Sequence, residues 1–158
     1  MNRAAETLLR FVNLTASGLL AGSLGFGEAI LTPGSREERT RRLEEKSSNE
    51  NAYFNAIGPI ALATSVTLAV ASRGRASTRK VLDVASALGL AGVLATTTLV
   101  TVPLNKKIEV TAPVDYPDGG SRTLIRNFGR AHAIRTVLGI SAFVCAVASS
   151  SLSTQRSR

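Results

Sequence analysis

Long stretches without a charged side chain alternate along this sequence with short stretches that are rich in charge. The charge-free runs cover residues 11–27, 51–72, 84–105 and 136–155. A helix needs about 20 mostly apolar residues to cross the hydrocarbon core of a bilayer, and each run reaches or approaches that length. A soluble helix bundle, the main structural alternative, would carry charges every three or four residues on its outer faces. The pattern therefore favours membrane helices.

The runs predict an all-α fold, a bundle of four transmembrane helices that forms a single integral membrane domain over residues 1–158. The helices are expected at about 10–31, 52–72, 81–104 and 131–152. Gly, Ala, Ser and Thr are frequent in the runs, as they are where membrane helices pack closely. Gly18 and Gly22 form a GxxxG pair of this kind. Small-residue faces of this type would also support a homo-oligomer.

Helix breakers and charge set the predicted topology. Pro33 and Gly34 would end the first helix, and Pro103, which lacks a backbone N–H, would close the third. Two longer loops, 35–51 and 105–131, then lie on one membrane face. The short loop 73–80 is wholly basic, which favours placing it and both termini on the cytoplasmic side of the cell membrane.

The composition narrows the classes of partner and cofactor. The net charge of +8 could suit nucleic acid, an anionic surface or an acidic ligand. However, acidic and basic residues balance in the arginine-rich stretch 35–51, and no aromatic residue interleaves them, so nucleic acid is not expected as a partner. The chain has one Cys and one His. These numbers fit neither an internal disulfide nor a metal site, and Cys145 is expected to be a packing residue.

His132 and Arg135 stand at the mouth of the fourth run. Spaced i,i+3 on a helix, they share a face. Three small residues continue that face: Gly139, Ala142 and Ala146. Because small residues usually face other helices, both polar side chains should point into the bundle near one membrane boundary. The alternative is that they reach the lipid headgroups or pair with loop acids such as Asp115 and Asp118.

Other polar residues should converge at the same end of the bundle. Glu28 lies near the end of the first helix, on one face with Asn13, Ser17, Ala21 and Leu24. Asn105 follows Pro103, and Asn55 begins the second helix. An ionisable residue at membrane depth is a functional candidate by default. The alternatives are that Glu28 is an interfacial acid paired with Arg36 or Arg135, and that Asn105 merely ends a helix. Transport is less favoured, since polar residues are expected at only one end.

Two motifs carry a family resemblance. VPLNKKIE (102–109) stands at the end of the third predicted helix, and RAHAIRT (130–136) at the start of the fourth. Together they resemble the anthrone oxygenase-like family of small four-helix membrane proteins, whose members typically show a Pro-Leu-Asn element followed by His-x-x-Arg-Thr. The chain has no Trp, and Phe128 and Arg130 stand where the family often has aromatic residues.

The resemblance implies oxidation of an anthrone to an anthraquinone by O2 without a metal or other cofactor. His132 would be the base that removes the acidic hydrogen. Arg135 and Asn105 would hold the enolate oxygen, and Glu28 would orient His132 or Arg135. The expected partners are therefore an apolar aromatic substrate that enters from the bilayer, O2 and lipid.

Two other functions stay open at this point. The same pocket could serve acid–base chemistry on an apolar metabolite, such as cyclisation or isomerisation, and O2 consumption with an anthrone would separate that reaction from oxygenation. Alternatively, the chain could be a non-catalytic scaffold or lipid binder. A His132 side chain that faces lipid would favour this last class.

Overall fold

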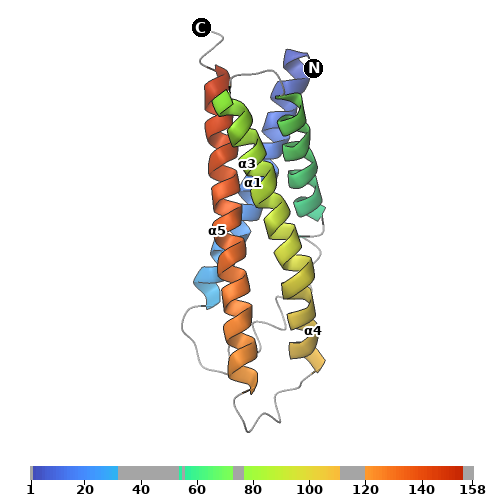
Figure 1. Cartoon of the computed structure of the whole chain (residues 1–158), viewed down its shortest axis with the longest axis vertical. Coiled ribbons are helices and arrows are strands. Elements are labelled where there is room, and N and C mark those ends of the chain that lie inside the picture. The colour runs from blue at the N-terminus through green and yellow to red at the C-terminus, as the bar shows by residue number, and fades with distance from the viewer. Residues whose placement is uncertain (1, 32–53, 55, 73–76, 111–119, 155–158) are drawn as a thin grey trace.

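A computed structural model describes residues 2–31, 54, 56–72, 77–110 and 120–154, and this part of the chain is helical apart from Asn2 and a turn at Ser72. Its helices are α1 (Arg3–Leu31), a shorter helix Ala56–Ala71, α3 (Ser77–Thr96), a π-helical turn η1 (Thr97–Thr101), α4 (Val102–Val110) and α5 (Gly120–Thr154). α3, η1 and α4 continue one another, so four helical segments run alternately up and down (Figure 1). The predicted all-α four-helix bundle is confirmed.

Within the described residues, three helices are long and apolar enough to cross a bilayer: Arg3–Leu24, Thr78–Leu104 and Arg126–Leu152. Large apolar side chains are exposed along their outer faces, including Phe11, Leu88, Val137 and Val144. Such a surface suits lipid rather than water, and the chain is a membrane protein. The described part of the second predicted span, 52–72, is the helix Ala56–Ala71 together with helical Phe54 and the turn at Ser72. The membrane orientation and the cytoplasmic termini stay predictions.

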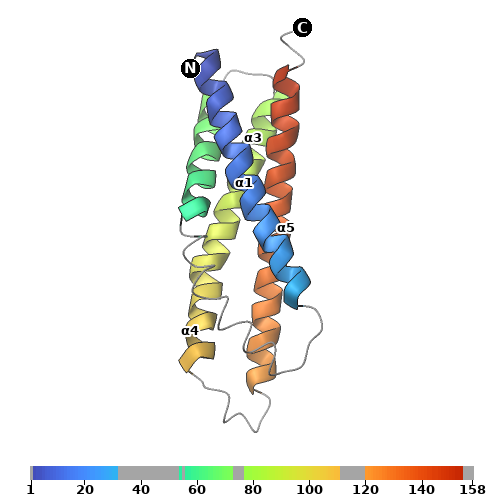
Figure 2. The same cartoon turned by 180° about the vertical axis from the view of Figure 1, so that it is seen from behind.

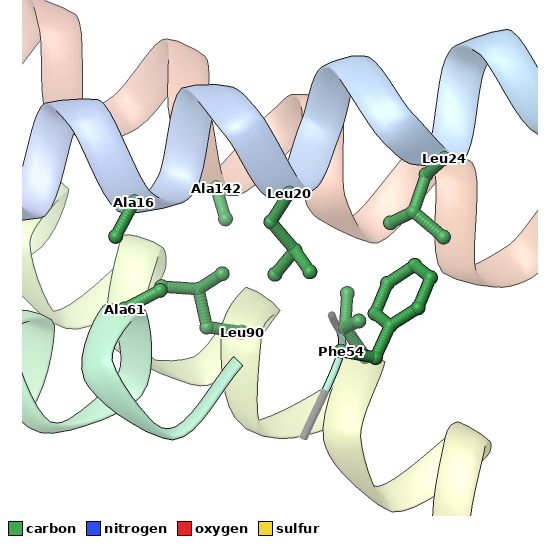
Figure 3. Packing of buried hydrophobic residues seen from close by; sticks show 8 residues of the cluster. Ala16, Leu20, Leu24, Phe54, Ala61, Leu90 and Ala142 are labelled. Carbon is green, nitrogen blue, oxygen red and sulfur yellow. The ribbon is translucent and has the colours of Figure 1, made fainter. Parts of the chain in front are cut away.

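The core lies where α5 packs against both α1 and α3 (Figures 1 and 2). Its buried members are small and branched side chains with one aromatic ring, and most of them are labelled in Figure 3: Ala16, Leu20, Leu24, Phe54, Ala61, Leu90, Val93 and Ala142. Glycine allows the closest approaches. A Cβ at Gly89 would lie 2.9 Å from the Ala142 Cβ, and one at Gly18 would lie 3.1 Å from the Phe143 ring. A Cβ at Gly22, the second residue of the GxxxG pair, would meet no atom of another segment within 4 Å.

The predicted starts of the first and fourth helices are wrong. Both helices begin earlier, in segments that are not continuously apolar, so the hydrophobic runs did not mark their first turns. α1 begins at Arg3 rather than near residue 10. The Asn2 side chain accepts the Ala5 N–H at 2.8 Å, as a helix N-cap does. α5 begins at Gly120 rather than near residue 131. At 1.5 Å per residue its length of about 52 Å exceeds the bilayer, so part of this helix extends beyond the hydrocarbon.

Pro103 does not close the third helix, contrary to the expectation from its missing N–H group. The chain passes from the π-helical turn η1 through Pro103 into α4, which ends at Val110. At the end of η1 the Val102 N–H donates to the carbonyl of Thr97, five residues back, where an α-helix would use the carbonyl of Thr98. Such local π adjustments are one way in which membrane helices accommodate proline. Much of the predicted loop 105–131 is therefore helical, namely residues 105–110 and 120–131.

A buried cluster of charges joins α1, α3 and α5 at the end of the bundle where α1 begins and α5 ends. The guanidinium of Arg10 faces the Asp83 carboxylate with both terminal nitrogens, at 3.4 and 3.3 Å. Its Nε donates to Glu6 at 3.2 Å, and Glu6 also pairs with Arg79. The Ser149 hydroxyl accepts from Arg10 and donates to Asp83. The expectation that only one end of the bundle is polar is therefore wrong.

A second polar layer lies one turn further along α1. The Asn13 amide donates to the Ser65 hydroxyl at 2.6 Å and to the Thr64 hydroxyl at 3.0 Å, and Ser65 lies 3.4 Å from the Ser86 hydroxyl. These bonds tie α1 and the helix Ala56–Ala71 to α3. Asn13 is buried, as are three residues that continue its face: Ser17, Ala21 and Leu24. The face of α1 that carries Asn13 therefore points into the bundle as far as Leu24.

The close contact at Gly89 predicts a stability difference between two glycine variants. Gly89→Ala should lower the free energy of unfolding by about 1–3 kcal/mol, because the added methyl would force α3 and α5 apart. Gly22→Ala is the matched control, since its methyl enters open space and alanine is the better helix former. Thermal unfolding in detergent micelles measures both. Equal stability of the two variants would contradict the packing described for Gly89.

The buried charge cluster makes a second prediction. Asp83→Ala should destabilise the protein by about 3–5 kcal/mol, because it removes the carboxylate that faces the buried Arg10 guanidinium. Replacing both, as in Arg10→Met with Asp83→Leu, should recover most of that loss. Arg3→Ala, at an exposed position of α1, is the control and should change little. Thermal unfolding in micelles measures the stability of Asp83→Ala, the double variant and Arg3→Ala. A double variant that is no more stable than Asp83→Ala would contradict the pairing of Arg10 with Asp83.

Candidate functional site

The chemistry of the predicted site would have to begin with His132 and Arg135, and both side chains are buried inside the bundle. His132 is 8% exposed and Arg135 is 5% exposed. The small residues that continue their face of α5 are buried as well: Gly139, Ala142 and Ala146. The predicted inward orientation of this face is confirmed, and the alternative in which the two side chains extend to the lipid headgroups is wrong. The loop acids Asp115 and Asp118 lie outside the described residues.

Arg135 is held by residues from two other segments. Its Nη1 atom donates to the Thr101 hydroxyl at 3.3 Å, and Thr101 ends the π-helical turn η1. The guanidinium carbon lies 4.9 Å from the centroid of the Phe54 ring, which is within the range of a cation–π contact. Phe54 is helical and lies two residues before Ala56 in the sequence. A hydroxyl and an aromatic face thus help to fix the guanidinium inside the bundle.

His132 lies one turn before Arg135 on the same helix face. Its ring is stacked with the ring of Phe128, with the centroids 6.4 Å apart and the planes 11° from parallel. The Nε2 atom of the imidazole is fully buried. The Thr136 hydroxyl donates to the His132 carbonyl at 3.1 Å. The three defined positions of the His-x-x-Arg-Thr motif therefore lie together on one buried stretch of α5.

Glu28 and Asn105 can be placed by their backbones alone. Glu28 belongs to the last turn of α1, and Asn105 to α4. Both helix segments lie toward the end of the bundle where α5 begins (Figure 2). The side chains of Glu28 and Asn105, and the whole of Asn55, lie outside the described residues. Contacts between these residues and His132 or Arg135 therefore stay predictions.

Two contact residues of the site were not predicted. Thr101 belongs to a cluster of threonines that precedes Pro103, and this cluster was the available signal. Phe54 follows another aromatic residue, Tyr53, near the start of a mostly aliphatic run, and nothing in its spacing relates it to Arg135. As for metals, the described residues contain no group of three or more His, Cys, Asp and Glu side chains that could hold an ion. That the reaction needs no cofactor stays a prediction.

The chain matches a known protein family. The model of the family described as anthrone oxygenase matches residues 49–145, which is more than half of the chain. The chain belongs to the anthrone oxygenase family. The resemblance carried by the two motifs is thereby confirmed. No curated protein and no solved structure matches the chain.

The part that matches the anthrone oxygenase family includes three of the four predicted site residues: Asn105, His132 and Arg135. Glu28 precedes it. Phe54 and Thr101, which contact Arg135, also lie within the matched part. In the buried cluster, only some of the residues lie within the matched part: Asp83 lies inside it, Arg10 before it and Ser149 after it. The family relationship therefore bears on the end of the bundle that holds His132 more directly than on the opposite end.

The hydrogen bond to Arg135 makes Thr101 a testable member of the site. Thr101→Val keeps the shape of the side chain and removes the hydroxyl, so a buried donor loses this acceptor. The expected loss of unfolding free energy is about 1–3 kcal/mol. Thr98→Val is the matched control, because Thr98 is exposed and its hydroxyl bonds the carbonyl of Leu94 in its own helix. Thermal unfolding in micelles should separate them, and equal shifts would argue against the contact.

Proposed function

We propose that this protein is a membrane-embedded oxygenase that oxidises an apolar, anthrone-like aromatic substrate with O2, without a metal or organic cofactor. The observation that carries the proposal is the burial of the chain's single imidazole beside a guanidinium, within a bundle of the anthrone oxygenase family. A buried imidazole is suited to proton transfer, and a buried cation is suited to holding an anion as it forms.

The first step is removal of a proton from carbon. The methylene group of an anthrone lies between two aromatic rings and opposite a keto group, so its conjugate base delocalises as an aromatic oxyanion. His132 acts as the general base and takes this proton on its imidazole. Arg135 stabilises the negative charge that develops on the oxygen. Thr101 and Phe54 contribute by holding the guanidinium in place.

The second step is carbon–oxygen bond formation. The electron pair of the carbanion reduces O2 and forms the C–O bond, and the resulting peroxide takes up the proton that His132 removed. Loss of the remaining C–H proton, with cleavage of the O–O bond, gives the quinone and water. The substrate is the reductant and O2 is the oxidant, so electrons and atoms balance without another reactant. Asn105 supplies an amide donor to the oxyanion, and Glu28 orients His132 or Arg135.

Acid–base chemistry without O2 is the closest alternative, because the same imidazole and guanidinium could promote cyclisation or isomerisation of an apolar metabolite. The family relationship favours oxygenation over this alternative. A purely structural or lipid-binding role is less favoured, since His132 lies inside the bundle and not on the lipid-facing surface. Substrate turnover without O2 uptake would identify the acid–base alternative.

The proposal predicts a specific defect and a specific rescue. In proteoliposomes supplied with an anthrone, His132→Ala should lower the rate of O2 uptake, corrected for spontaneous oxidation, by roughly 100-fold or more. Added imidazole should restore part of this rate, because it can take the place of the missing side chain as the base. A substrate deuterated at the methylene carbon should react more slowly with the wild type, provided that C–H cleavage limits the rate.

Arg135→Ala is the matched control for the rescue. It sits on the same helix face and is similarly buried, but its role is electrostatic, so guanidinium rather than imidazole should restore activity. Thermal unfolding of both variants separates a chemical defect from a loss of fold. A folded His132→Ala protein that still oxidised anthrone at the wild-type rate would disprove the role of His132.

A further inference from the structure

A groove opens on the outside of the bundle between two wall segments. One wall is η1 with the start of α4 and includes Leu99 and Pro103. The other wall is α5 and includes Ala131 and Ile134. The volume is about 550 Å³, and apolar side chains make up most of the lining. Two polar side chains, Asn127 and Arg130, belong to the α5 wall toward the start of that helix.

The groove and the buried site share two stretches of helix, one in η1 and one in α5. Leu99 and Val100 of η1 line the groove, and the next residue, Thr101, accepts the hydrogen bond from Arg135 inside the bundle. On α5, Ala131 lines the groove and His132 follows it directly. The groove therefore lies outside, and the imidazole and guanidinium inside, the same two stretches of backbone.

Nothing in the described part of the chain covers the groove from outside. Leu99 is 76% exposed and Ile134 is 54% exposed, so in a bilayer both would contact either lipid or a bound apolar molecule. The volume of about 550 Å³ gives room for a small molecule, which would stay in contact with the bilayer on the open side of the groove. Arg130 and Asn127 add hydrogen-bond donors at one end of an otherwise apolar surface. This combination suits a flat apolar molecule that carries oxygen atoms along one edge.

We propose that this groove is a lateral binding site at which the aromatic substrate docks from the bilayer before it reaches His132. Arg130 and Asn127 bind the keto and hydroxyl oxygens, while Leu99, Pro103 and Ile134 contact the rings. The inference rests on the proposed function for the class of ligand. It adds a site outside the bundle, and it makes Arg130 a residue that determines specificity rather than a catalytic residue.

The absence of tryptophan from the sequence allows a direct test. Leu99→Trp introduces a single tryptophan at the groove. Leu88→Trp is the matched control, because Leu88 is similarly exposed, at 68%, on the same continuous helix but outside the groove. Each variant is placed in phosphatidylcholine nanodiscs and titrated with a dihydroxyanthraquinone, which resembles the oxidised product and quenches tryptophan fluorescence.

The groove predicts saturable quenching of Leu99→Trp, half-complete at a quinone concentration about tenfold lower than for Leu88→Trp. The control tryptophan should report only quinone dissolved in the lipid, with quenching that rises linearly. Equal, non-saturating quenching of the two variants would overturn the proposal. So would quenching of Leu99→Trp by brominated lipid that added quinone does not displace, because an acyl chain would then be the occupant.

Arg130 can be tested in the same background. Arg130→Gln in the Leu99→Trp protein should raise the concentration for half-quenching about five- to tenfold, which is the size of one ordinary hydrogen bond. Arg126→Gln, one turn earlier at another exposed position outside the groove, should leave it unchanged. Equal effects of the two substitutions would contradict the role of Arg130.

Binding in this assay does not require turnover, so the two proposals can fail separately. If Leu99→Trp binds the quinone but His132→Ala still oxidises an anthrone, the groove stands and the catalytic assignment falls. If His132→Ala is inactive but the groove tryptophan behaves like its control, the catalytic assignment stands and the groove is not the docking site.

Discussion

Hydrocarbon offers no hydrogen bonds, and this constraint governs where the polar side chains of the bundle lie. Deep within the apolar spans, charged and amide side chains turn toward other helices: Arg10 contacts Asp83, and Asn13 contacts Ser65. The outer faces carry side chains such as Phe11, Leu88 and Val137. In a soluble bundle the same arrangement would be inverted, with the charges outside. The polar interior is therefore what the membrane requires of any chain that keeps charges at this depth.

Arg10 and Arg135, the buried arginines of the described residues, stand toward opposite ends of an apolar core and have different surroundings. Arg10 pairs with the carboxylates of Glu6 in its own helix and Asp83 in α3, and it donates to the Ser149 hydroxyl of α5. The contacts described for Arg135 include a hydroxyl and an aromatic ring, which hold a guanidinium in one orientation. A cation held in a fixed orientation next to an imidazole suits the binding of an anion as it forms. At 1.5 Å per residue, Arg135 and Ser149 are about 21 Å apart along α5.

Much of the fold could be predicted because lipid imposes a strong pattern on sequence. The charge-free runs marked the spans, and the small residues after Arg135 marked the inward face of α5. Helix ends were harder, because the start of α5 lies in a segment without a continuous apolar run. The cluster around Arg10 was missed although Arg10 and Asp83 stand at the edges of two runs, as Arg135 does at a third. The contact of Phe54 with Arg135 depends on how separate helices pack, and the spacing of residues along the chain does not reveal it.

The π-helical turn between α3 and α4 has a consequence for how relatives of this protein could differ. Because a π turn holds more residues than an α turn, shortening the chain by a single residue within 97–101 could restore regular α geometry. Five π-helical residues turn through about the same angle as four α-helical residues, so the positions beyond the deletion would keep nearly the same orientation. Pro103 would still face α5, whereas the residues inside the turn, Thr101 among them, would change their facing. A relative that is one residue shorter here could therefore keep the wall of the groove and lose the contact to Arg135.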